Sequence, residues 1–246
     1  MKCWTFLLVL LILVCSVSPQ ARSDVFMDYD FTDGLVWQIG GFEVYDVMQR
    51  GEIVGEARIE YSGLTMMDQP AVRVEWTESW TDEDGETTII DTDVKMIQSD
   101  LKALMSTHVR TIGEDEWRFE GNYTGETLVF GAYYPGEAQR EEASLSRGGR
   151  FCDTDILPFL LRNIPFDDGN FVTLTTVDVK SHSFITPIAS VMGSEIVETA
   201  NTQYDCWVVN ISLGSDGFTA YYSKTDTHFL VKVRYNDREL VLNHHS

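Results

Sequence analysis

The sequence predicts an all-β protein built on one curved antiparallel sheet. Apolar and polar residues alternate over many short segments, turn residues separate those segments at hairpin distances, and only two stretches have the spacing of a helix. Alternation with a period of two gives a sheet one apolar face and one solvated face, which antiparallel sheets allow. Because helices do not alternate with the strands, a parallel sheet is disfavoured.

Alternation marks the strands, and turn residues mark where they end. In one segment Val72, Val74 and Trp76 share a face, opposite Arg73 and Glu75. The clearest alternating segments are 53–61, 72–80, 207–213 and 229–235. Gly, Asn and Asp supply the positive φ angles of tight turns, as in 82–85, 122–125 and 214–217. We expect roughly ten strands in meander order.

Two short stretches are predicted to be helices that cover the apolar face of the sheet. Residues 95–106 place apolar side chains four, seven and eight positions apart, the spacing of one helical face. Residues 154–161 follow Asp153, a good N-cap, and have Pro158 near the first turn, where a missing amide is tolerated. The expected helical cover of the concave face is Leu101, Leu104, Leu157 and Leu160.

Two such helices are too short to cover a sheet of this size. The sheet is therefore expected to curl on itself and to leave an apolar cavity that the helices do not fill. A fully packed sandwich of two sheets fits the same alternation and has no cavity. The aromatic candidates for the cavity wall are Trp76, Trp80, Trp117, Phe119, Phe130, Trp207, Phe218 and Tyr222. Aromatic residues in strands are also common in a packed core, so both interpretations stay open.

The first 23 residues have the parts of a secretory signal peptide. Lys2 gives a positive end, residues 6–15 are an unbroken apolar run, and small residues lead up to Ser23. The run is short for the ~30 Å of a membrane's hydrocarbon, although a count over 4–17 leaves an uncleaved anchor as the alternative. We expect cleavage near Ser23 and a periplasmic or secreted protein. Residues 24–246 would then form a single curved antiparallel β domain with no integral membrane span.

The chain is strongly acidic. It has 39 Asp and Glu against 18 Lys and Arg, a formal net charge of −21. Nucleic acid and anionic lipid surfaces would be repelled unless basic residues were gathered in one patch, and the sequence has no basic run that would form one. We therefore expect no nucleic-acid partner, and an acidic surface that keeps an exported protein soluble.

No reactive signature is present. The histidines His108, His182, His228, His244 and His245 form no pair at the spacing of a helical zinc motif. The motifs of serine hydrolases and the phosphate-binding glycine loop are absent as well. We expect no catalytic residue, no metal site and no cofactor. A hydrolase would instead require a cleft with a histidine or a close carboxylate pair whose pKa values are shifted.

Two cysteines remain once the signal peptide is removed, Cys152 and Cys206. In an oxidising compartment they either form a disulfide or stay as small buried residues, and both outcomes are compatible with the sequence. No pair of cysteines has the two-residue spacing of a thioredoxin-like motif, which argues against a redox role.

Residues 153–162 consist of an aspartate followed by leucines and an arginine, and glycine and aromatic positions of predicted strands recur in 45–47, 51–57, 193–197, 204–209 and 220–233. These segments resemble a family of exported bacterial proteins, domain of unknown function 3108. In this resemblance, 153–162 corresponds to the family's central helix. The family's glycine-bearing approach to the strand at Tyr204 is replaced here by 200–203. The resemblance covers about residues 40–243 and implies a half-barrel, similar to that of envelope lipoprotein carriers, without an established catalytic residue.

These observations together predict an exported envelope protein that is not an enzyme. Its concave face is expected to bind an apolar ligand, such as a lipid or lipoprotein, or a partner protein of the envelope. A structural or assembly protein with a packed core is the alternative, and a cell-wall hydrolase is a further one. The oligomeric state does not follow from the sequence.

Overall fold

The computed structural model describes residues 26–28, 38–137, 140–146, 149–164, 166–167, 169–236 and 238–245. The predicted signal peptide, residues 1–23, lies outside the described residues. Among those that are described, no helix has the length and apolar character needed to span a bilayer.

Fifteen strands form one large sheet. Every neighbouring pair in it is antiparallel except β1 with β11. In spatial order the strands are β1 (Phe26–Asp28), β11 (Phe171–Thr173), β14 (Ile188–Glu198), β15 (Gln203–Leu213), β16 (Asp216–Ser223), β17 (Leu230–Arg234), β18 (Glu239–His245), β2 (Phe42–Gln49), β3 (Glu52–Met66), β4 (Gln69–Thr81), β5 (Thr87–Ile97), β6 (Ala103–Ile112), β7 (Asp115–Asn122), β8 (Thr127–Tyr133) and β9 (Glu141–Ser146).

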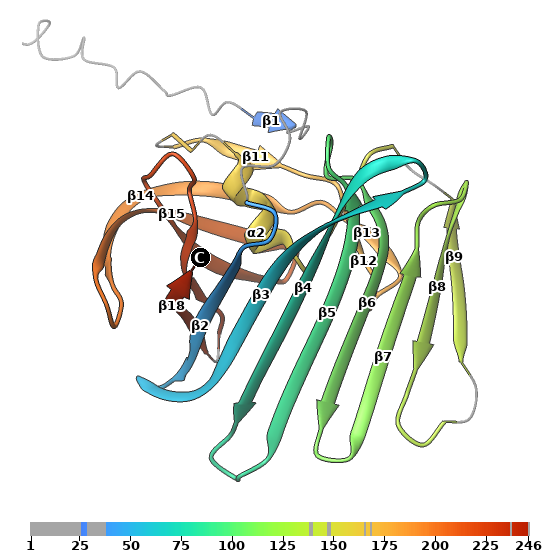
Figure 1. Cartoon of the computed structure of the whole chain (residues 1–246), viewed down its shortest axis with the longest axis horizontal. Coiled ribbons are helices and arrows are strands. Elements are labelled where there is room, and N and C mark those ends of the chain that lie inside the picture. Colours follow the sequence, from blue (N-terminus) through green and yellow to red (C-terminus); the bar gives the residue numbers. More distant parts are fainter. Residues whose placement is uncertain are drawn as a thin grey trace, which may run out of the picture.

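The sheet is curved but not closed. Its end strands β1 and β9 do not pair with each other, so the sheet is not a complete barrel. Figure 1 shows β2 to β9 side by side, with the C-terminal strands curling around the inner face. Strand β18 pairs with β2 and so joins the C-terminal meander to the N-terminal one. The predicted all-β class with a curved antiparallel sheet is confirmed.

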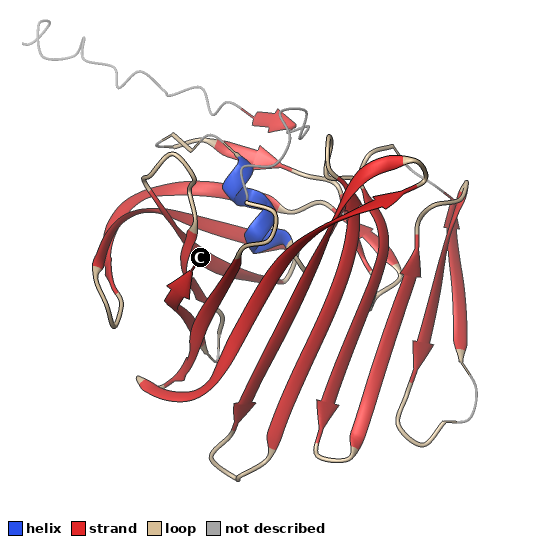
Figure 2. Cartoon of the chain, viewed as in Figure 1, coloured by secondary structure: helices blue, strands red, loops and turns tan. Residues whose placement is uncertain are grey.

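One of the two predicted helices is present. Helix α2 (Leu157–Leu160) continues into the 3₁₀ turn η1 (Leu161–Asn163), and both lie on the inner side of the curve, as Figure 2 shows. Asp153 is not the helix cap as predicted, because Ile156 occupies that position and makes no side-chain cap. The backbone N–H of Asp155 instead donates to Asp153 Oδ1 at 2.9 Å, closing a turn just before the helix.

The predicted helix over 95–106 is wrong. Strand β5 continues to Ile97 and β6 begins at Ala103, with a turn between them that is closed by a hydrogen bond from the Ile97 N–H to the Lys102 carbonyl. Leu101 has a φ of 52°, which ends any helical run. Leu101 and Leu104 are buried, but as turn and strand residues rather than as helical cover. The apparent helical spacing came from residues on either side of a hairpin turn.

The core near the helix is densely packed. All four residues of α2 are buried, and the Phe159 ring lies 4.9 Å from the Trp76 ring. The Tyr222 hydroxyl donates to the Pro158 carbonyl at 2.6 Å. Burial of a large apolar side chain contributes about 1.5–3 kcal/mol, so α2 is an integral part of the core. Leu157 and Leu160 belong to the main core cluster, together with residues of the large sheet.

A second, smaller core lies under β6 to β8. There a three-stranded sheet packs against the inner face, in the order β10 (Cys152–Asp153), β12 (Thr176–Asp178) and β13 (Ser183–Ile185). Its buried side chains are Ala103, Tyr123, Leu128, Phe130, Phe151, Val177 and Val179. The three-stranded sheet thus covers the inner face of the large sheet at this end, and α2 covers it at the other end.

Candidate functional site

Between the two cores, the concave face holds a cleft of about 220 Å³. One part of its wall is apolar and consists of Trp76, Ile90, Pro158, Leu213, Phe218 and Tyr235. The other part is polar and consists of Glu78, Thr92, His108, Thr154, Asp155, Lys180 and Arg238. The apolar and the polar parts of the wall therefore enclose the same cleft.

Strand register brings several of these residues together. Trp76 pairs with Thr92 across β4 and β5, and Thr92 pairs with His108 across β5 and β6. Residues opposite each other in an antiparallel pair point to the same face of the sheet. Glu78 and Ile90 form the next such pair. The inward positions of these strands therefore carry polar side chains where the alternation would otherwise place apolar ones.

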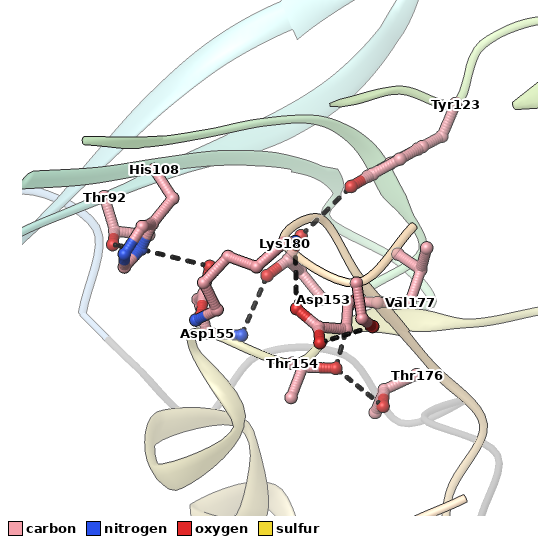
Figure 3. Close-up of polar contacts among 11 residues, drawn as sticks. Thr92, His108, Tyr123, Asp153, Thr154, Asp155, Thr176, Val177 and Lys180 are labelled. Carbon is pink, nitrogen blue, oxygen red and sulfur yellow. Dashed lines mark hydrogen bonds and ion pairs between the residues drawn. The ribbon is translucent and has the colours of Figure 1, made fainter. Parts of the chain in front are cut away.

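His108, Asp155 and Lys180 form a charged cluster in the cleft wall (Figure 3). Asp155 Oδ2 lies 3.3 Å from His108 Nδ1, and Asp155 Oδ1 forms an ion pair with the Lys180 ammonium. The Asp155 side chain is 8% exposed. Burial alone would raise the pKa of Asp155, but Lys180 and the neighbouring His108 outweigh burial and hold that pKa below its usual range. The Asp155 carboxylate is thus ionised within the wall.

Asp153 lies beside this cluster and has the opposite electrostatic character. It is 1% exposed, and Tyr123 donates to its Oδ2 at 3.5 Å. Burial, reinforced by the charge of Asp155, raises the pKa of Asp153 to about 7. The Thr154 hydroxyl donates to the Val177 carbonyl at 3.0 Å, which ties the segment to the three-stranded sheet (Figure 3). Two neighbouring carboxyl groups therefore have pKa values shifted in opposite directions.

The cluster does not have the geometry of a nucleophile activated by a histidine. Thr92 Oγ1 lies 3.1 Å from His108 Nδ1, the same nitrogen that faces Asp155. In a catalytic triad the hydroxyl and the carboxylate bind opposite nitrogens of the imidazole ring. Within the part of the chain that the structure describes, no three His, Cys, Asp or Glu side chains gather closely enough to hold a metal ion. The cleft has a histidine and carboxyl groups with shifted pKa values, as a hydrolase would require, but Thr92, His108 and Asp155 do not form a proton relay to a nucleophile.

Glu78 and Arg238 form a buried ion pair across the cleft. Arg238 Nε donates to Glu78 Oε1 at 2.6 Å, and Glu78 is 2% exposed. The guanidinium lies 4.5 Å from the centre of the Trp80 ring and 4.9 Å from that of Tyr235. Because Arg238 comes from the turn between β17 and β18, this pair connects the C-terminal meander to β4.

A second buried ion pair lies at the far end of the helix. Arg162 Nη1 donates to Glu43 Oε1 at 2.5 Å, and the Tyr45 hydroxyl donates to Glu43 Oε2 at 2.6 Å. Burial and then Glu43 raise the pKa of Tyr45 and of Tyr61 well above their ordinary value. Burial opposes the charge of Arg162, but Glu43 outweighs it and raises the pKa of Arg162. These residues fasten the helix to β2 and β3 beside a hollow of about 340 Å³.

Comparison with known proteins places the chain in a family. The family model described as Protein of unknown function (DUF3108) matches residues 45–241. The chain belongs to this family. No curated protein matches it. Among solved structures, it is similar to the crystal structure of a beta-barrel-like protein of domain of unknown function DUF1849 from Brucella abortus. The two are 13% identical, with a TM-score of 0.50, and the match covers 85% of this chain and 97% of that one. This likeness concerns the fold alone.

In this member of the DUF3108 family, the predicted aromatic residues lie in several environments. Trp76 and Phe218 line the cleft, and Trp80 lies under Arg238. Phe119 lies 6.2 Å from the His108 ring. The remaining candidates lie elsewhere: Phe130 in the second core, Tyr222 against Phe166, Trp207 under Lys224, and Trp117 half-buried on β7.

The two cysteines lie inside the protein. Cys152 and Cys206 are both buried, and the structure has no disulfide between them. Burial, with the nearby charge of Asp205, raises the pKa of the Cys206 thiol to about 12, so this thiol is not a reactive nucleophile.

The charged residues of the cleft were not singled out from the sequence. His108, Asp155 and Lys180 belong to three segments that meet only in the fold. One signal was available, since Glu78 and Thr92 occupy inward positions of strands whose other inward residues are mostly apolar. Polar residues at such positions need partners and therefore often mark a site.

Proposed function

We propose that this protein binds a small amphiphilic ligand in the concave cleft and does not change it chemically. The observation that supports this most directly is the composition of the wall, where Trp76, Phe218 and Tyr235 face the same space as Asp155 and Lys180. An apolar pocket with a few fixed polar groups is the usual form of a small-molecule site. The absence of a histidine relay among the described residues favours binding over catalysis.

The size of the cleft limits the ligand. Its volume of about 220 Å³ is below the ~300–1,000 Å³ of typical ligand pockets. The concave face beside the cleft is filled by α2 on one side and by the second core on the other. A whole lipid would not be enclosed, and we expect a short apolar group or the end of a longer chain to enter. The setting that we propose is the cell envelope, in agreement with the signal-peptide pattern of residues 1–23.

A role in envelope assembly is the second candidate. The helix is packed on all sides, with Leu157, Phe159 and Leu160 at most 2% exposed, so that much of the concave face is a true core. A protein with a filled interior would act through its outer surface instead. The two candidates differ in whether the cleft is occupied in the cell.

Two neighbouring residues of β5 allow a matched test. Ile90 lines the cleft, whereas Ile89 is 36% exposed on the opposite face of the strand. We expect Ile90→Trp to fill the cleft and Ile89→Trp to leave it open. Native mass spectrometry of protein purified from the periplasm should show the same bound mass on the wild type and on Ile89→Trp, and none on Ile90→Trp. A wild type without bound mass, or an Ile90→Trp variant that keeps it, would contradict the proposal.

A further inference from the structure

A second hollow next to the cleft has a lining of unusual charge for this protein. The hollow measures about 340 Å³ and lies between the β2–β3 turn and the β17–β18 turn. Its described lining includes Arg50, Arg234 and Arg238 and one carboxylate, Glu239. The chain as a whole has 39 acidic and 18 basic residues. We name this space the arginine hollow. Basic side chains outnumber acidic ones in its described lining, whereas acidic residues outnumber basic ones in the chain as a whole.

The arginine hollow and the cleft are neighbours. Tyr235 and Arg238 line both spaces. The position of Arg238 is fixed by its buried bond to Glu78 and by the rings of Trp80 and Tyr235 on which it lies. A molecule with its apolar end against Trp76 would therefore extend past Arg238 toward the other two arginines. The cleft and the arginine hollow together therefore fit a ligand that has one apolar end and one charged end.

The two outer arginines are able to change partners. Arg50 pairs with Glu83, with side chains 76% and 65% exposed, and Arg234 pairs with Glu239 at 2.6 Å with its side chain 50% exposed. Exposed ion pairs contribute little to stability, so a ligand anion can compete with these carboxylates. A guanidinium presents its donors in a fork that fits a carboxylate or a phosphate with two hydrogen bonds.

We propose that the cleft and the arginine hollow together bind an anionic amphiphile. Its carboxylate or phosphate head lies in the arginine hollow, and its short apolar tail enters the cleft. This inference rests on the proposed function and adds the charge and the orientation of the ligand. The apolar wall selects the tail, and the arginines select the head.

The test is isothermal titration calorimetry with four probes that share an eight-carbon tail: octanoate, octyl phosphate, octan-1-ol and octylammonium. At least one anion should bind about tenfold tighter than octan-1-ol, as charge-assisted hydrogen bonds to arginine require, and octylammonium should bind most weakly. Tighter binding of octyl phosphate would identify a phosphate head, and tighter binding of octanoate a carboxylate head. Either result supports the proposal.

Arg234→Gln should weaken the preferred anion about twofold to fivefold and leave octan-1-ol unchanged. Arg118→Gln is the matched control, because Arg118 is 47% exposed and pairs with Glu120 at 2.8 Å outside both spaces. Equal affinity for octan-1-ol and both anions would overturn the anionic head while leaving the cleft as a binding site. If none of the four probes binds, and native mass spectrometry finds no bound mass, the proposed function fails together with this inference.

Discussion

The two ends of the inner helix are held by buried charges of different kinds. At the C-terminal end, Arg162 and Glu43 are both nearly inaccessible, with side chains 6% and 8% exposed. At the N-terminal end, Asp155 is 8% exposed but its partner Lys180 is 40% exposed. The Arg162–Glu43 pair is buried in the core, whereas the Asp155–Lys180 pair extends from the core to the solvent. From this difference we infer that the Arg162–Glu43 pair fixes the position of the helix, whereas the Asp155–Lys180 pair can respond to changes in the solvent.

The largest expected effect comes from breaking the sealed pair. Arg162→Leu would leave Glu43 buried without its cation, and such a change costs about 3–5 kcal/mol of unfolding free energy. Urea unfolding followed by tryptophan fluorescence would measure it. The double variant Glu43→Gln with Arg162→Leu should recover part of the loss, because no uncompensated charge remains. A loss of less than about 1 kcal/mol in the single variant would mean that the pair behaves as an exposed one.

A smaller effect is expected at the other end of the helix. In Asp155→Asn the Lys180 ammonium can turn to water, so we expect a loss of about 1–2 kcal/mol by urea unfolding. Asp93→Asn serves as a comparison, because Asp93 pairs with Arg73 at 2.9 Å on the outer face, and it should lose less. If Asp155→Asn is as destabilising as Arg162→Leu, the two ends do not differ in the way described.

A third effect concerns the pH dependence of stability and separates the two ends of the helix most clearly. The folded pKa of Asp153 is about 7, above its value of 3.8 in an unfolded chain, so the folded state holds the extra proton between these values. Its contribution to stability is therefore complete below pH 3.8 and is lost as the pH rises toward 7. Asp155 has a lowered pKa, so its contribution is present at higher pH and is lost only as the pH falls below about 4.

Asp153→Asn tests this directly. Relative to the wild type, the variant should gain about 3 kcal/mol between pH 4.5 and pH 7.5, because an amide does not ionise. Urea unfolding at the two pH values provides the measurement. A difference between wild type and Asp153→Asn that is independent of pH would contradict the raised pKa.

The sequence was sufficient for the sheet and insufficient for one helix. Alternation specifies which face of a strand is buried, and that rule held in long strands such as β2, β4 and β6. The helix predicted from helical spacing at 95–106 was wrong, because Ile97 and Leu104 lie on two strands and Leu101 lies in the turn between them. Residues on both sides of a hairpin reproduce a helical period by chance. The positive φ of Leu101, which decides between the two structures, is set by the turn and has no signal in a leucine.

The site was harder to predict because its residues are far apart in the chain. Glu78 and Arg238 are separated by 160 positions, and their pairing depends on how the C-terminal meander curls. The arginine hollow illustrates the same limit, since Arg50 and Arg234 come from two turns and form no basic run. A charged patch was excluded from the sequence on the ground that no such run exists. The fold nevertheless brings three arginines from two turns to one hollow, each of them paired with a carboxylate.

The pairing of β18 with β2 has a consequence for how the chain reaches its native state. Asn243 Nδ2 donates to Asp46 Oδ1 at 2.8 Å across 197 positions, whereas β2 to β9 pair with their sequence neighbours. The hairpins of the N-terminal meander can form before the C-terminal strands have been made, but β2 keeps an open edge until β18 pairs with it. Unpaired edges are sites of aggregation. Because β18 is the last strand in the chain, the edge of β2 is covered only once the whole sheet-forming sequence has been made.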